Sequence, residues 1–190
     1  MINVIKGIHI LNASRLEDRE IEPAARAVEE AFGARAVLER TSLDLDHAFD
    51  APRGQYRSAV LLAQLLAAAP EQDVKWIAIV DVDLFIPVLT FVFGEAQLGG
   101  RAAIVSVHRL SNEFYGMPAD HPRLLDRLGK EIIHELGHTA GLIHCRQFEC
   151  VMRSSTYVGE IDLKAGRLCR GCRDHLADLQ RAGAVRTVLS

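Results

Sequence analysis

Three histidines and a glutamate stand at a spacing that suits the binding and use of a metal ion. They lie in the segment HELGHTAGLIH, which begins at His134 and ends at His144. On a helix, His134 and His138 would project from one face one turn apart, so that both imidazoles could bind one zinc ion. Glu135 would lie beside the metal as a general base. Gly141 would end the helix in the left-handed conformation, which returns the chain and brings His144 to the metal as third ligand.

All four cysteines of the chain follow this segment directly, as the pairs Cys145 with Cys150 and Cys169 with Cys172. Two such pairs are the usual ligand set of a closed tetrahedral zinc site. Two disulfides are the alternative, but they need an oxidising compartment, and the N-terminal residues carry no secretory signal. The sequence therefore favours a second, structural zinc ion, which makes two Zn²⁺ per chain. A cytoplasmic location is expected on the same grounds.

The complete pattern over residues 134–172 is His-Glu-x-x-His-x-x-Gly-x-x-His-Cys-x4-Cys-x-Met-x16-Cys-x-x-Cys. It closely resembles the signature of the archaemetzincins, a branch of the metzincin zinc metallopeptidases, and the upstream segments DVDLF and FVFGEA are also similar to that family. The resemblance implies a catalytic zinc held by His134, His138 and His144, with Glu135 as general base. It further implies that Met152 is the methionine of the Met-turn beneath the zinc ligands.

The same resemblance gives one strand a role. Metzincins bind extended peptides by pairing them with the edge strand above the zinc, and the matching segment here is Thr90, Phe91, Val92, Phe93 and Gly94. Strand addition satisfies the substrate backbone and leaves alternate side chains to enter pockets. Some metzincins have a tyrosine two residues after the Met-turn methionine. Ser154 occupies this position here, so we assign no role to a tyrosine.

Three other functions were weighed against a metzincin peptidase. A thermolysin-like site would take Glu160 as third ligand from a second helix, but the surrounding SSTYVGEID is rich in turn and β-branched residues, which favours His144. A zinc-stabilised binding module with vestigial or very narrow peptidase activity is the main alternative. A nucleic-acid-binding zinc protein is disfavoured by the net charge of −3. We expect the flanking arginines to balance the charge of four thiolates; they are Arg146, Arg167, Arg170 and Arg173.

The rest of the sequence predicts an α/β fold of the α+β metzincin-like type. Strand and helix signals alternate, which indicates a twisted, mostly parallel sheet with helices against it. Residues 90–94 would form one antiparallel edge strand. The helix expected at residues 23–32 would have Pro23 at its start and Gly33 just past its end. Further strands are expected at residues 3–11, 34–40, 74–80 and 102–107, and further helices at residues 55–69 and 124–140.

We expect a single catalytic domain over residues 1–190, with an N-terminal subdomain at 1–141 and a small zinc-stabilised lobe at 142–190. The predicted partner is a peptide or small-protein substrate, with no nucleic acid and no membrane, because no apolar stretch is long enough to span one. The sequence does not determine the oligomeric state, and a monomer is compatible with it. Structural or solvated roles are assigned to Asp81, Asp83, His9, His47, His108, His121 and His175.

Overall fold

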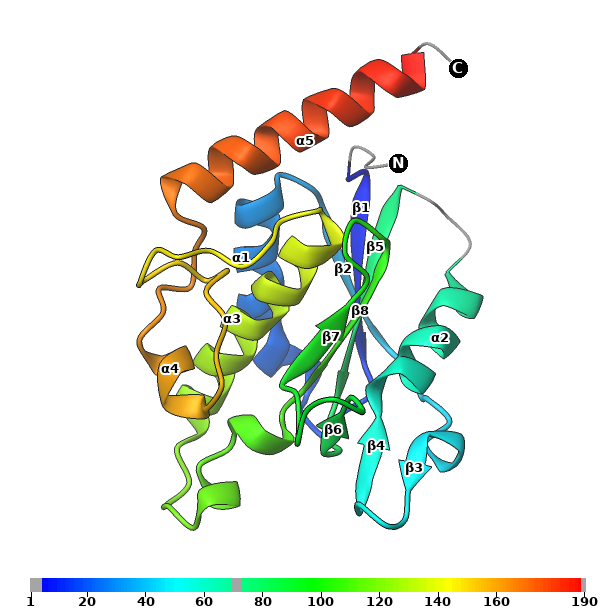
Figure 1. Cartoon of the computed structure of the whole chain (residues 1–190), viewed down its shortest axis with the longest axis vertical. Coiled ribbons are helices and arrows are strands. Elements are labelled where there is room, and N and C mark those ends of the chain that lie inside the picture. Colours follow the sequence, from blue (N-terminus) through cyan, green and yellow to red (C-terminus); the bar gives the residue numbers. More distant parts are fainter. Residues whose placement is uncertain (1–4, 70–72, 189–190) are drawn as a thin grey trace.

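The computed structural model describes residues 5–69 and 73–188. A five-stranded sheet of order β2-β1-β5-β8-β7 forms its centre (Figure 1). Its strands are β1 (Gly7–Asn12), β2 (Ala36–Arg40), β5 (Val74–Val80), β8 (Ala102–Ser106) and β7 (Gly94–Ala96). All neighbours pair in parallel except β7, which pairs antiparallel with β8 at the edge. The predicted sheet, mostly parallel with one antiparallel edge, is confirmed.

Helices cover both faces of this sheet. α1 (Asp18–Phe32) and α3 (His121–Thr139) lie on one face, and α2 (Ser58–Ala68) lies on the other (Figure 1). Alternate residues of each strand therefore enter two different cores. Ile77 of β5 packs beneath α1 and α3, whereas its neighbour Ala78 packs beneath α2. Burial on both faces explains why β5 is apolar at every position except Lys75.

The remaining elements are short apart from the last helix. A second sheet of order β3-β4-β6 is built from β3 (Phe49–Asp50), β4 (Gln55–Arg57) and β6 (Leu84–Phe85). After α3 the chain is irregular except for α4 (Val158–Asp162), until α5 (Arg170–Val188) crosses the top of the molecule in Figure 1. Single 3₁₀ turns occur at Asp46–Ala48, His108–Leu110 and Glu113–Tyr115. No helix in the described part of the chain is both long and apolar enough to cross a membrane.

Several predicted helix starts were wrong. α1 begins at Asp18, so Pro23 lies inside the helix and not at its start. The cause is a polar first turn, in which the Glu20 carboxylate accepts a hydrogen bond from the backbone N of Glu17. Gly33 caps the other end with φ 66°, as predicted. The predicted helix at residues 55–69 begins only at Ser58, because the preceding residues form β4.

The active-site helix is longer at its start than predicted. α3 begins at His121 and ends at Thr139, whereas residues 124–140 were expected. The side chain of Asp120 caps its first turn by accepting a hydrogen bond from the backbone N of Arg123. The first strand begins at Gly7, and residues 3 and 4 of the predicted strand lie outside the described part of the chain.

The predicted edge strand at residues 90–94 was displaced. Of that segment only Gly94 belongs to β7, while Val92 forms an isolated bridge to Leu84. Side chains replace strand pairing at its start, because the carbonyl oxygen of Thr90 accepts hydrogen bonds from Arg53 and Gln55. The apolar run Phe91, Val92 and Phe93 thus reflects packing into two different cores, with Phe91 and Phe93 in one and Val92 in the other, and not a continuous ladder.

Candidate metal centre

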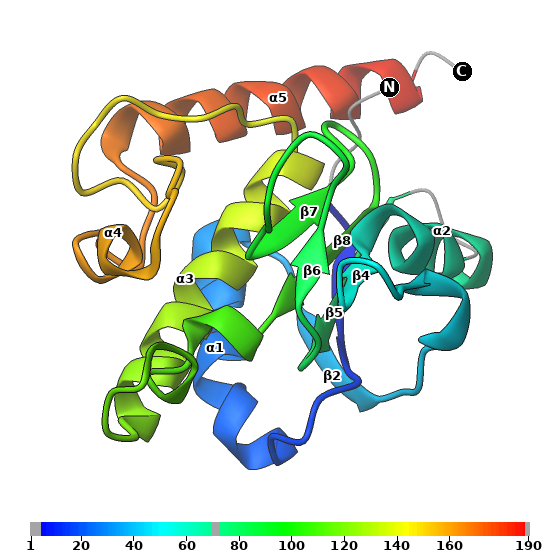
Figure 2. The same cartoon turned by 60° about the horizontal axis from the view of Figure 1, so that its bottom comes forward.

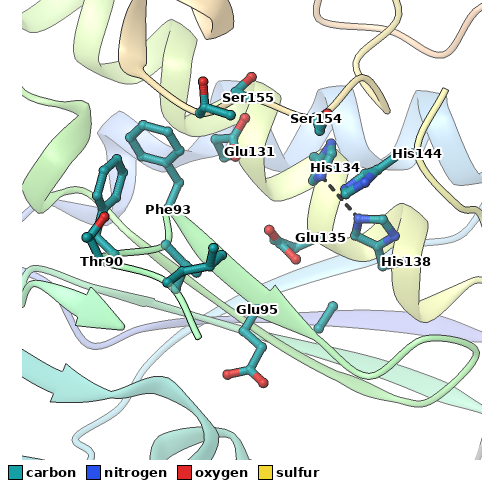
Figure 3. Close-up of a pocket in the computed structure, with 16 residues that line it drawn as sticks. Thr90, Phe93, Glu95, Glu131, His134, Glu135, His138, His144, Ser154 and Ser155 are labelled. Atoms are coloured by element: carbon teal, nitrogen blue, oxygen red, sulfur yellow. Dashed lines mark hydrogen bonds between the residues drawn. The ribbon is translucent and has the colours of Figure 1, made fainter. Parts of the chain in front are cut away.

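The three predicted histidine ligands meet at one point. His134 and His138 project from α3 and His144 comes from the loop after it, and their ligand nitrogens all lie within 4.8 Å of one another (Figure 3). Gly141 makes this return possible with φ 98°, a conformation that glycine adopts readily. The spacing argument therefore predicted the gathering of these side chains correctly.

In His134 and His138, the hydrogen bond made by Nδ1 leaves the lone pair of Nε2 available to bind a cation. Nδ1 of His134 lies 2.8 Å from the carbonyl oxygen of Val151, and Nδ1 of His138 lies 2.8 Å from that of Leu142. Because a carbonyl only accepts, each Nδ1 donates and each Nε2 carries a lone pair. The two Nε2 atoms are 3.1 Å apart. Two lone pairs at this distance repel unless a cation lies between them, and tetrahedral zinc ligands would be about 3.4 Å apart.

Electrostatics favour the neutral form of all three rings. Burial lowers the pKa of His134 well below its usual value, and it lowers the pKa of His138 and His144 in the same direction. Only neutral imidazole binds a metal. The donor set therefore fits a zinc ion.

Glu135 lies beside the histidines with 6% of its surface exposed. Burial raises its pKa well above the usual value, and the Glu131 carboxylate raises it further. The side chain packs directly against Gly94 of β7. A Cβ atom at Gly94 would lie 2.7 Å from both Cγ and Oε1 of Glu135, closer than real Cβ contacts. Because Gly94 has no side chain, there is room for the Glu135 side chain against β7.

Met152 lies fully buried under the helix that carries the histidines. Its sulfur and methyl group pack so closely on Gly137 that a Cβ atom there would overlap them. The turn is closed by the backbone N of Cys145, which donates to the carbonyl oxygen of Met152 at 2.9 Å. A single hydrogen bond thus ties this methionine to the residue that follows His144.

The four cysteines form a second cluster, with all Sγ atoms within 4.8 Å of one another. Sγ of Cys145 lies 3.8 Å from that of Cys169, and Sγ of Cys150 lies 3.7 Å from that of Cys172. A disulfide needs about 2.05 Å, whereas two thiolates on one tetrahedral zinc are about 3.8 Å apart. The geometry matches a metal site and not the disulfide alternative.

A cleft of about 390 Å³ connects the histidines with the edge of the sheet (Figure 3). One wall is formed by residues 89–96, which we call the sheet-side wall, and the other by residues 154–156, the C-terminal wall. α3 forms the floor with Glu131, His134, Glu135 and His138. All five residues predicted to bind substrate line this cleft, namely Thr90, Phe91, Val92, Phe93 and Gly94.

Comparison with known proteins agrees with this arrangement. The sequence profile of peptidase family M54 matches residues 38–178. The archaemetzincin of Methanocaldococcus jannaschii is 39% identical over 149 residues, which are 78% of this chain and 80% of that protein. The archaemetzincin of Methanopyrus kandleri is 39% identical over 157 residues, or 82% of this chain and 86% of that one. The chain belongs to the archaemetzincin family. It is thereby a zinc-dependent metallopeptidase of family M54.

Solved archaemetzincin structures share the whole fold. The crystal structure of the Methanopyrus kandleri archaemetzincin superposes with a TM-score of 0.81 at 34% identity, covering 92% of this chain and 94% of that one. A zinc-dependent peptidase from Methanocorpusculum labreanum gives 0.80 at 32% identity, covering 90% and 100%. Metalloproteinase-II from Bacteroides fragilis, at 14% identity and a TM-score of 0.56, shares the fold alone.

One argument against the thermolysin-like alternative was wrong. We expected no helix around Glu160, but this residue lies in α4. That single turn is held from outside, because Asp162 pairs with the buried Arg127 of α3. Glu160 nevertheless does not line the cleft, and its carboxylate instead accepts hydrogen bonds from the backbone N and the hydroxyl of Thr156. His144 is the residue that joins the other two histidines, as in the archaemetzincin signature.

Residues given structural roles do lie outside the cleft. Asp83 accepts hydrogen bonds from Nε and Nη2 of Arg109 at 2.5 and 2.7 Å, and another from Gln55. His9 stacks on Trp76 with ring centroids 4.3 Å apart. These contacts join strands and loops of the N-terminal part and do not reach the histidine cluster.

Sequence reasoning missed several cleft residues. Glu131 lies four residues before Glu135, so helical spacing alone could have placed it on the same face of α3. Glu95 follows the predicted edge segment and was left out because that segment was displaced. Ser155 and Thr156 reach the cleft through an irregular chain path that no pattern in the sequence indicates.

Proposed function

We propose that this chain hydrolyses peptide bonds at a zinc ion bound by His134, His138 and His144. The observation that carries the proposal is the pair of Nε2 atoms 3.1 Å apart, each on a ring whose Nδ1 faces a backbone carbonyl. When bound, zinc would supply Lewis acidity that polarises the substrate carbonyl and makes water more acidic. Backbone carbonyls of Val151 and Leu142 orient two of the rings, as outer partners commonly do for metal ligands.

Glu135 is proposed as the general base. It would take a proton from the attacking water and pass it to the nitrogen that leaves. Its burial supports this role, since the raised pKa brings the carboxyl closer to the range in which it can both accept and donate. Gly94 supports it as well, because only a residue without a side chain leaves room for the carboxylate against β7.

The sheet-side wall is proposed to bind the substrate backbone. β7 is the last strand of its sheet, so among the described residues one of its edges has no strand partner. An extended peptide could pair with that edge over the glutamate and histidines. Because only Gly94–Ala96 is regular strand, we shift the expected pairing from residues 90–94 to β7 and assign Phe91 and Phe93 to side-chain contacts instead.

The cysteine cluster is proposed to hold a second, structural zinc, giving two Zn²⁺ per chain. Its four sulfur atoms have the spacing of a closed site. The segment it fastens contains only one short turn of helix between His144 and α5. We propose that residues 142–190 form a lobe that depends on this metal, attached to a subdomain of residues 1–141. The absence of nucleic-acid partners and the cytoplasmic location remain predictions.

The test is a peptide-library digest read by mass spectrometry, with the wild type and Glu135→Gln compared at equal zinc content. We expect the wild type to cleave and the variant to lose at least a thousandfold in rate while keeping two zinc ions and its melting temperature. Hydrolysis at the wild-type rate in Glu135→Gln would refute the role of the base. A wild type that holds zinc, binds peptides and cleaves none would favour the binding module instead.

A further inference from the structure

We propose that the end of the cleft beside Glu131 is a subsite for a basic substrate side chain, lysine or arginine, on the residue that follows the cleaved bond. The acceptors are the carboxylate of Glu131 and the hydroxyl of Ser155. This inference deepens the proposed peptidase function and rests on it.

Glu131 offers an acceptor atom that the protein leaves without a partner. It lies on α3 four residues before Glu135, lines the cleft and is only 3% exposed. Its Oε1 accepts a hydrogen bond from Nζ of Lys164 at 3.2 Å. Within the described part of the chain its Oε2 accepts none. A carboxylate has room for about four hydrogen bonds, so this oxygen can take a donor from a ligand.

Ser155, on the C-terminal wall, provides a second acceptor. Its Oγ is buried and has no hydrogen-bond partner among the described residues, although Ser155 lines the same cleft. Glu131 from α3 and Ser155 from the C-terminal wall both line this cleft (Figure 3). Buried polar atoms nearly always have a partner, because an unmet hydrogen bond is costly there. Ser155 Oγ on the C-terminal wall is such an atom, and together with the unpartnered Oε2 of Glu131 on the floor it points to a ligand that donates.

The walls of this subsite suit the apolar stem of a long side chain. The rings of Phe91 and Phe93 meet edge to face with centroids 5.2 Å apart, and both line the cleft. The guanidinium of Arg109 lies 4.2 Å from the centre of the Phe91 ring and holds this wall from behind. Lysine and arginine carry apolar stems that pack well on such surfaces.

The carboxylate of Glu131 favours a cation over a neutral donor. Nζ of Lys164, whose side chain is fully buried, pairs with only one of the two Glu131 oxygens. A hydrogen bond between a cationic donor and a carboxylate is about twice as strong as one between neutral groups. Lys164 is bound to the other carboxylate oxygen and therefore does not block Oε2.

The position of the subsite identifies the substrate residue. The proposed base Glu135 returns its proton to the leaving nitrogen, so the residue that supplies this nitrogen must lie on its side of the cleft. Glu131 lies one helical turn beyond Glu135, away from His138, which is about 5.4 Å along α3. The side chain of the residue after the cleaved bond is the one that reaches Glu131.

Two matched peptides test the proposal. They differ only in carrying lysine or norleucine after the cleaved bond. Both side chains have the same four-carbon chain, but only lysine has the ammonium group. We expect the wild type to prefer lysine by about tenfold in kcat/KM, Glu131→Gln to lose this preference, and Ser155→Ala to reduce it. Asp126→Asn, an exposed charge change on the same helix, should keep it. Equal cleavage of both peptides by the wild type, or an unchanged preference in Glu131→Gln, would overturn the subsite.

A binding measurement separates this inference from the proposed function. Two hydroxamates that carry lysine or norleucine after the zinc-binding group are titrated calorimetrically into the zinc-loaded wild type and both variants. Tighter binding of the lysine compound to the wild type, lost in Glu131→Gln, supports the subsite even where no peptide is cleaved. If Glu131→Gln does not fold, Ser155→Ala decides, since it leaves the pair with Lys164 intact. Equal binding of both compounds by the wild type, or a lysine preference that Ser155→Ala leaves unchanged, would refute the subsite.

Discussion

The two walls of the cleft are built by different means. The sheet-side wall continues into β7, whose backbone is bonded to β8 through the pairs Gly94 with Val105 and Ala96 with Ala103. The C-terminal wall belongs to residues 142–169, which are irregular apart from α4 and lie on the other side of α3 (Figure 2). Side chains hold that segment, through the cysteine cluster and the pairs Arg127 with Asp162 and Glu131 with Lys164.

Because of this difference, we expect the two walls to be sensitive to different kinds of mutation. A backbone ladder tolerates most side-chain changes but leaves no space for an added atom, because packed interiors have few voids. A segment without such a ladder depends on individual side-chain contacts and fails when one of those contacts is removed. Substitutions on the two sides should therefore damage activity in distinguishable ways, by steric overlap on one side and by loss of an anchor on the other.

The largest effect is expected at the ligand that the C-terminal segment supplies. His144→Ala should remove one of two zinc ions and lower turnover by at least about a thousandfold, because two histidines alone do not hold a catalytic zinc firmly. Glu160→Gln serves as control and should keep both metals. Zinc content by mass spectrometry checks this, and two tightly bound zinc ions in His144→Ala would refute the assignment of the third ligand.

On the sheet side, Gly94→Ala should lower kcat by about a hundredfold while zinc content stays at the wild-type value. The added methyl group would overlap Glu135 and the carbonyl oxygen of Ile104, and a small displacement of a catalytic group has effects of this size. Gly129→Ala on α3 is the control, since its Cβ would meet Ala24 at an ordinary 3.7 Å. Equal activity of the two variants would show that Gly94 does not position the base.

Cys169→Ser tests the anchor of the C-terminal segment. Cys145 follows His144 directly, so an incomplete thiolate set should free the loop that presents this histidine. We expect loss of one zinc, a melting temperature lower by about 10 °C and a further tenfold loss of turnover measured well below that temperature. Full activity under these conditions would show that the two metal sites act independently.

The smallest effect concerns the pair that joins α4 to α3. Hydrogen bonds from Arg127 hold the pKa of Asp162 below its usual value, so the pair stabilises the fold above the ordinary aspartate pKa and loses this effect as pH falls through the lowered one. Asp162→Asn should cost about 1–2 kcal/mol at pH 7. In urea unfolding, the difference in the free energy of unfolding between Asp162→Asn and the wild type should become smaller below pH 4. Asp174→Asn, at an exposed position, is expected to leave the free energy of unfolding unchanged. A difference in this free energy between Asp162→Asn and the wild type that does not depend on pH would contradict this account.

The sequence predicted the two clusters better than the surfaces around them. Helical spacing and the turn at Gly141 place His134, His138 and His144 from local geometry alone, so little tertiary information was needed. The strand at residues 90–94 was displaced because Arg53 and Gln55, far away in sequence, bind the carbonyl oxygen of Thr90, and Arg53 also binds that of Leu89. α4 was missed for a similar reason, since its last residue, Asp162, pairs with Arg127 of α3 and its Val158 and Ile161 are buried in the core.

His144 and Cys145 are consecutive in the chain, yet their side chains belong to different clusters. On the proposed function, this adjacency sets the order in which the protein matures during synthesis. A ribosome releases His134, His138 and His144 before Cys169 and Cys172, so the loop with the third histidine lacks its fastening until synthesis has passed Cys172. A truncated or still-growing chain would therefore hold the catalytic residues without an assembled centre. On the proposed function, competence for hydrolysis then requires that synthesis has passed Cys172.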